Sequence, residues 1–266
     1  MKTYLDPSSK GLQESGRPST AFTRLVGILL ITGAIGVPTL LILHDQLNID
    51  EESAALAFAT YQQHQLPVFL TYYALMAAGV LFLLLAPLLY ALYARLQTPL
   101  RLMVLICMLL AGGALAVASS RWLIVLPYLA QIYTNPQTGA ATRVALDVAY
   151  KGTSYFLGIT ISEFFYNIFT GMWSIFLATM LLRSSRRKAW FHWIGIIGGA
   201  TMLIGSFEQI FASAGPGPVF RQILIAGIVA WMIWLVWLAI SLLIKTSETR
   251  QQESHFPIES GKSAST

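Results

Sequence analysis

Six apolar runs, each about twenty residues or longer, constrain most strongly what this chain can fold into. A helix of about 20 residues crosses the roughly 30 Å hydrocarbon core of a bilayer. Backbone groups in lipid need hydrogen-bond partners within their own helix. The sequence therefore predicts an all-α membrane protein with six transmembrane helices in a bundle. The predicted spans are residues 25–43, 67–93, 102–120, 154–182, 189–211 and 219–244.

The composition and the termini agree with a single transmembrane domain over residues 21–245. Charged residues make up 11% of the 266 residues, whereas a soluble domain has about 25%. Residues 1–20 and 246–266 are rich in Ser, Gln and charged side chains, which predicts disordered tails. The lipid bilayer is thus the one partner that composition implies.

The distribution of Lys and Arg predicts that both termini are cytoplasmic, because cytoplasmic loops are enriched in these residues. Thirteen of the 17 lie before span one, between spans two and three, between spans four and five, or after span six. The other four are Arg121, Arg143, Lys151 and Arg221. Since membrane topology accounts for the net charge of +5, we expect no nucleic-acid partner.

Two segments between the third and fourth spans differ from ordinary loops, the first because it is too apolar. Residues 122–133, WLIVLPYLAQIY, fit either an extension of the third helix through Pro127 or a segment lying in the interface. In residues 140–151, Asp147 lies four residues from both Arg143 and Lys151, a spacing typical of a surface helix.

The fourth predicted span carries an unexpected carboxylate, Glu163. With a helical period of 3.6, it falls on one polar stripe, which comprises Thr160, Glu163, Asn167, Thr170 and Ser174. Lipid cannot satisfy such a stripe, so we expect it to face the bundle interior. Counted from residue 154, Glu163 would lie about 12 Å deep.

Other spans offer ionisable groups at a similar expected depth in the outer half of the membrane. Arg121 follows a small-residue face of the third span, Glu208 ends a similar face of the fifth, and Arg221 opens the sixth. We expect Arg121 to be the partner of Glu163. Intramembrane ionisable groups suggest function, although such a network also fits a purely structural role in fixing helix register. The candidate binding residues are Arg121, Glu163, Asn167, Glu208, Thr160 and Arg221.

The middle of the chain resembles a known family. Its features are an RW pair followed by LPYLAQIY, then SEFFYNIFTGMWSIFLA, a basic turn and W-x-G-x-x-G-G-A. These resemble bacterial six-span membrane proteins grouped as a domain of unknown function. The corresponding positions are Arg121, Trp122, Glu163, Trp173, Gly195 and Gly199. The resemblance implies the fold and a bacterial inner membrane, and it implies no particular activity.

Two functional classes fit these observations. The first is a protein that binds or moves a small ligand or ion through a polar cavity open to the outer side. The second is a non-catalytic scaffold or regulatory component whose intramembrane charges only fix helix packing. A membrane enzyme ranks third, because we find no motif for a nucleophile, a metal site or a cofactor. A water-filled cavity that reaches Glu163 would favour the first class, and a tightly packed centre the second.

Overall fold

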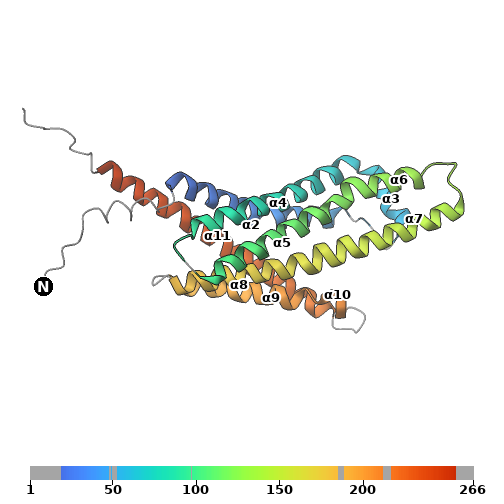
Figure 1. Cartoon of the computed structure of the whole chain (residues 1–266). Helices are drawn as coiled ribbons and strands as arrows, with labels where there is room; N and C mark the ends of the chain where they lie inside the picture. Colours follow the sequence, from blue (N-terminus) through green and yellow to red (C-terminus); the bar gives the residue numbers. More distant parts are fainter. Residues whose placement is uncertain are drawn as a thin grey trace, which may run out of the picture.

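The computed structural model of the chain describes residues 19–47, 49, 53–96, 98–184, 189–211 and 217–255. Every regular element in these residues is helical (Figure 1), so the all-α prediction is confirmed. Most of the two predicted tails, residues 1–18 and 256–266, lies outside the described residues.

Five helical stretches are long and apolar enough to cross a membrane. They are Thr20–Leu43 in α2 (Thr20–Gln46), Gln65–Leu92 (α4), Pro99–Tyr133, Ala140–Ser184 and Pro218–Ile244 in α11 (Gly217–His255). Side chains such as Ile28, Leu84 and Ile233 are more than half exposed on the outside of the bundle, which suits contact with lipid. The chain is thus a membrane protein with several apolar helices.

The fifth predicted span is shorter than the other five. Residues 189–211 form a 3₁₀ turn η3 (Ala189–Phe191), helix α9 (His192–Gly205) and the four-residue α10 (Glu208–Phe211). The helix is interrupted at Ser206 and Phe207, so α9 has only 14 residues. Five of the six predicted spans therefore meet the length criterion. That the fifth predicted span crosses the membrane stays a prediction.

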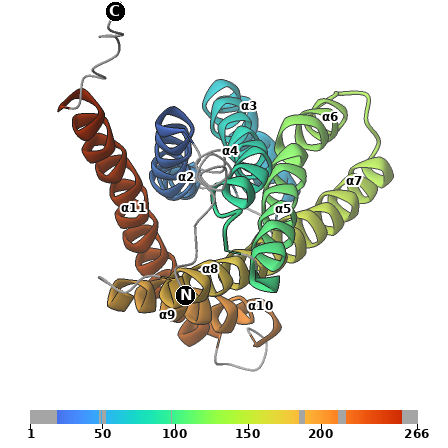
Figure 2. The same ribbon diagram turned by 60° about the vertical axis from the view of Figure 1, so that its left-hand side comes forward.

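Short α9 and the five longer helices nevertheless form a closed ring. Helix α4 packs on α5 (Pro99–Ser120), α5 on α8 (Tyr166–Ser184), α8 on α9, α9 on α11, α11 on α2, and α2 on α4. Short α9 thus takes the place between α8 and α11 in this ring, and it lies alongside α8 in Figure 2. Its glycines allow this close packing, since they present bare backbone to both neighbours.

Two stretches continue well beyond the length that a bilayer requires. Helix α5 runs through a π-helical turn, η1 (Arg121–Val125), into α6 (Leu126–Tyr133). Helix α7 (Ala140–Thr153) runs through a longer π-helical segment, η2 (Ser154–Phe165), into α8. Residues 122–133 therefore extend the third helix, and the surface helix predicted at 140–151 is continuous with the fourth. Residues 246–255, predicted as part of the tail, are helical in α11.

Helices α3 (Ala54–Gln63), α6 and α7 form a cap at one end of the bundle, which we call the cap end (Figure 1). The hydroxyl of Ser53 accepts a hydrogen bond from the Leu56 amide at the start of α3. A carboxylate oxygen of Asp147 on α7 accepts a hydrogen bond from the Ala54 amide at 3.4 Å and pairs with Lys151 at 2.9 Å. The same aspartate that was expected on a surface helix therefore ties α7 to α3.

Candidate functional site

The two π-helical segments lie beside each other where the bundle meets its cap. Segment η2 packs on α5, and η1 directly follows α5. A π-helical turn carries an extra residue relative to the α-helix, which shifts the side chains that follow, and such turns are frequent at functional sites. Arg121 is the first residue of η1, and Ser154 is the first residue of η2.

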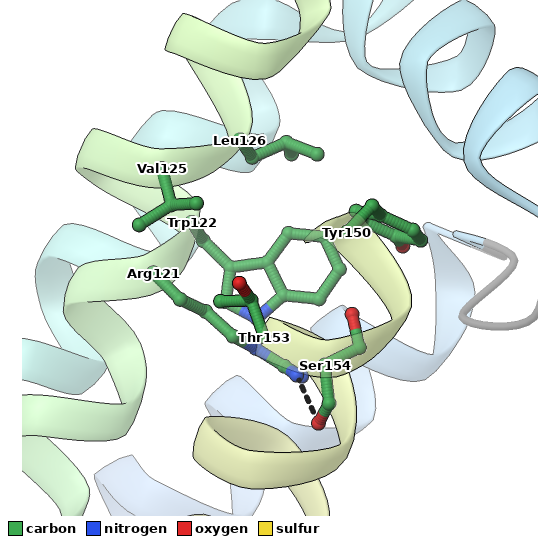
Figure 3. Close-up of a pocket in the computed structure, with 7 residues that line it drawn as sticks. All are labelled: Arg121, Trp122, Val125, Leu126, Tyr150, Thr153 and Ser154. Carbon is green, nitrogen blue, oxygen red and sulfur yellow. Dashed lines mark hydrogen bonds between the residues drawn. The ribbon is translucent and has the colours of Figure 1, made fainter. Parts of the chain in front are cut away.

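Arg121 is buried between these segments, with 8% of its surface exposed. Its Nη1 donates a hydrogen bond to the backbone carbonyl of Ser154 at 2.9 Å (Figure 3). Its guanidinium lies 4.7 Å from the centre of the Trp122 ring, and Trp122 stacks on Tyr72 of α4 at 4.5 Å. The cation thus sits among aromatic and backbone groups at a helix–helix contact.

Gly158 provides the room for this guanidinium. A Cβ atom at position 158 would overlap Arg121 Nη1 and lie 2.6 Å from its Cζ. By contrast, a Cβ at Gly152, six residues earlier, would have no heavy atom within 4 Å. The arginine and the glycine are therefore a matched pair, and any side chain at 158 displaces the cation.

A small cavity borders the guanidinium. It is lined by Arg121, Trp122, Val125, Leu126, Tyr150, Thr153 and Ser154 (Figure 3). The space open to a water-sized sphere is about 10 Å³, which is close to the minimum that one water molecule requires. A larger ligand would reach Arg121 only if the side chains around it moved.

The predicted polar stripe on the fourth span does not hold over its whole length. Asn167, Thr170 and Ser174 on α8 are buried, as expected, but Glu163 is exposed and Thr160 is half-buried. The reason is the π-helical geometry of η2, which has hydrogen bonds between residues five apart and not four. The Thr160 hydroxyl accordingly donates to the Tyr155 carbonyl, five residues earlier, at 3.2 Å. The side-chain amide of Asn167 donates to the Glu163 carbonyl.

The expected depth of Glu163 also changes. It was counted from residue 154 as the end of a span, but the helix continues without interruption to Ala140. Counted instead from Arg183 at the other end, Glu163 lies 20 residues away, or about 30 Å along an α-helix. Arg121 lies 20 residues from Arg101 on α5 by the same count. Both side chains therefore lie at the same distance along their helices from a basic residue near the opposite helix end.

Glu208 and Arg221 form a separate group. Glu208 begins α10, which packs against α11, and Arg221 is exposed near the start of α11. The Glu208 carboxylate and the Arg221 guanidinium are close enough for their opposite charges to interact. Phe207 contacts Phe164 of η2 with ring centroids 5.6 Å apart. These two charges are thus near each other, next to η2, and neither lines the Arg121 cavity.

A second pocket at the cap end was not predicted. It has a volume of about 250 Å³ and is lined by Tyr61, Gln62, Gln65, Pro127, Ala130, Gln131 and Thr134. The Gln62 side-chain amide donates to the Thr134 hydroxyl at 2.9 Å across it. The sequence signal was the run YQQHQ before span two, whose glutamines stand out in a chain this apolar. They could not be placed opposite Gln131 until the third helix was known to continue past Pro127.

The predicted Arg121–Glu163 pair stays a prediction. The hydrogen bond described above goes from Arg121 to a backbone carbonyl, and Glu163 contributes its own backbone carbonyl to Asn167. The structure brings Arg121 together with Ser154, Gly158 and Trp122. Of these, the sequence singled out Trp122 only through the family resemblance.

Comparison with known proteins gives one match. The family model described as Domain of unknown function (DUF4386) matches residues 25–241, from α2 to most of α11, and includes both π-helical segments. No curated protein and no solved structure matches the chain. The resemblance found in the RW pair, the SEFFYNIFTGMW stretch and the glycine-rich helix is confirmed by a match of this extent. The chain therefore belongs to the DUF4386 family, a domain of unknown function.

Proposed function

We propose that this protein is a multi-pass membrane protein that binds a small anionic ligand at the cap end, with Arg121 as the positively charged group. The observation that carries the proposal is the burial of Arg121 beside a cavity at the junction of two π-helical segments. Burying a guanidinium within a protein is costly unless it is paired, and ionisable residues in the interior of membrane proteins often mark a binding or transport site. A guanidinium favours carboxylate and phosphate oxygens, because its donors match their geometry.

The binding test uses thermal unfolding of the purified protein in detergent. Inorganic phosphate and acetate should raise the Tm of the wild type more than uncharged glycerol does, because only the anions pair with the guanidinium. Arg121→Gln should abolish this anion-dependent shift. Arg143→Gln is the matched control, since Arg143 lies exposed on α7 and lines neither pocket.

Gly158→Ala tests the position of the charge without removing it. The new Cβ displaces the guanidinium, so the anion-dependent shift should fall by at least half. Gly152→Ala, which meets no neighbouring atom, should leave the shift unchanged. An equal response of wild type and Arg121→Gln to phosphate and acetate would contradict the proposal.

A second function is favoured by the packing of the bundle centre. Trp173, Trp231 and Trp234 fill it, each at most 1% exposed, and α8 and α9 touch through backbone at Gly171 and Gly199. This supports a scaffold or regulatory component rather than a protein with a solute path through its centre. Under this alternative, neither phosphate nor acetate raises the Tm of the protein more than glycerol does, and Arg121 acts only in helix packing.

We further propose six crossings with both termini cytoplasmic in a bacterial inner membrane. The charge distribution supports the orientation, the position of α9 in the ring supports the sixth crossing, and the family resemblance supports the membrane. In a Cys107→Ala background we would introduce Asp50→Cys, Ser185→Cys, Pro216→Cys and Ser254→Cys singly. An impermeant maleimide added to intact cells should label positions 50 and 216 only. Positions 185 and 216 would label alike if α9 did not cross.

A further inference from the structure

The centre of the bundle is built from three tryptophans on two helices. Trp173 lies on α8, and Trp231 and Trp234 lie on α11. The ring centroid of Trp173 is 6.2 Å from that of Trp231 and 6.3 Å from that of Trp234. Helix α9 closes the cluster, since a Cβ at Gly195 would lie 2.5 Å from the Trp234 ring.

The three indole N–H groups differ in their hydrogen bonding. Trp234 Nε1 donates to His192 Nδ1 at 3.4 Å. Trp173 Nε1 and Trp231 Nε1 are buried, and neither has a hydrogen-bond acceptor among the residues that the structure describes. Nearly all buried donors in proteins have a partner, whether a protein group or an ordered water molecule. Two such donors in one cluster therefore call for an explanation.

A mutual interaction between the two rings explains at most one of them. The Trp173 and Trp231 rings are nearly perpendicular, with an interplanar angle of 81°. In an edge-to-face pair, the positive edge of one ring points at the negative face of the other. Only one of the two rings can present its edge in this way. At least one indole N–H consequently needs an acceptor of another kind.

The position of the cluster makes this need stronger. Trp173 lies ten residues from Arg183 and ten from Glu163, which is about 15 Å along the helix in either direction. Trp231 lies thirteen residues from each end of the apolar stretch Pro218–Ile244. Both tryptophans are thus halfway along their apolar helices, where lipid offers no hydrogen-bond acceptor from outside.

The surrounding polar groups are small and uncharged. Thr170, one turn before Trp173 on α8, and Ser174 beside it are 1% and 0% exposed. The Ser174 hydroxyl donates to the Thr170 backbone carbonyl at 2.7 Å. Thr170 and Ser174 offer hydroxyl groups and carry no charge that could neutralise an ion. These residues therefore suit a neutral hydrogen-bond acceptor better than an ion.

We propose that the bundle centre is a binding site for a neutral, water-sized hydrogen-bond acceptor, a water molecule in the purified protein, held by the indole N–H of Trp173 or Trp231. A water molecule accepts the indole hydrogen and can in turn donate to a hydroxyl such as that of Thr170, which gives it the two or more partners that buried water needs. This site is separate from the Arg121 cavity and does not depend on the function proposed for it.

Ultraviolet resonance Raman spectroscopy tests the proposal, because an indole vibration shifts when the N–H donates a hydrogen bond. Difference spectra of wild type against Trp173→Phe and against Trp231→Phe isolate each indole. Trp190, which is 66% exposed, gives the position of a hydrated indole through Trp190→Phe. For Trp173 or Trp231, or for both, the indole band should coincide with that of Trp190 to within the width of the Trp190 band. Both bands at the position of a non-bonded indole would overturn the proposal.

A second measurement needs no variant. A cryo-electron microscopy map at a resolution that shows water should contain a peak at hydrogen-bond distance, about 2.7–3.2 Å, from Trp173 Nε1 or Trp231 Nε1. The absence of a peak at both nitrogens would overturn the proposal. A peak that grows when bromide replaces chloride in the buffer would also overturn it, because the site would then hold an ion.

Discussion

Replacing Gly199 with alanine should clearly destabilise the protein, because helices α8 and α9 touch through backbone at this position. The Cβ would lie 2.5 Å from the Gly171 carbonyl oxygen and 2.8 Å from Ile175 Cγ1. The reciprocal contact is equally short, since a Cβ at Gly171 would lie 2.6 Å from the Gly199 carbonyl oxygen. Backbone cannot rotate away as a flexible side chain can, so α8 and α9 would have to separate.

The expected loss in the free energy of unfolding is about 1–3 kcal/mol, the usual range for overpacking, and we expect the upper end. The measurement is the Tm of the purified protein in detergent, together with the yield of monodisperse protein after size exclusion. Gly171→Ala should behave in the same way, because it enters the same contact from the other helix.

Gly113→Ala is the matched control. Gly113 also lies within a long apolar helix, but a Cβ there would have no heavy atom within 4 Å. Alanine favours the helix over glycine by up to about 1 kcal/mol, so this variant should be as stable as the wild type or slightly more stable. Similar losses for Gly199→Ala and Gly113→Ala would contradict the close approach of α8 and α9.

The sequence predicted the features that depend on hydrophobic length and on small residues. The apolar runs predict the helical bundle, and the spacing Gly195-x-x-x-Gly199 is typical of a helix face that packs closely. In the structure these glycines face different neighbours, with Gly195 against Trp234 of α11 and Gly199 against α8. Periodicity identifies a face that can pack closely, but the choice of partner depends on the tertiary arrangement.

The features that the sequence did not predict arise mainly from helix irregularity. Neither Ser154 nor Gly158 carries a sequence signal for a π-helical segment, so the hydrogen bond from Arg121 to the Ser154 carbonyl could not be predicted. The π-helical segment η2 changes the direction of the polar stripe and leaves Glu163 exposed. The pocket at Gln62 and Gln131 depends on the continuation of α5 past Pro127. The burial of Trp231 and Trp234 in the bundle centre also depends on the tertiary arrangement, because an apolar span does not show which of its faces is buried.

Removing the charge of Arg121 is expected to have the other large effect. Arg121→Leu leaves the Ser154 carbonyl without its charged donor and removes the contact with Trp122. Hydrogen bonds to charged groups contribute about 1.5–3 kcal/mol, so the free energy of unfolding should fall by about that amount. Arg121→Lys should recover only part of it, because an ammonium is a point charge and lacks the planar fork of the guanidinium.

A double-mutant cycle with Glu163 separates a pair from two independent residues. The sequence predicts that Arg121 and Glu163 form an ion pair across the helices, and the Glu163 side chain is exposed on the bundle. We would measure Glu163→Leu, Arg121→Leu and the double variant, with Glu208→Leu in place of Glu163→Leu as the control cycle. A coupling energy of about 1–3 kcal/mol is expected for Glu163 if the two side chains pair within the bundle. Additive losses would show that the side chains of Arg121 and Glu163 do not pair, and the predicted ion pair would then be wrong.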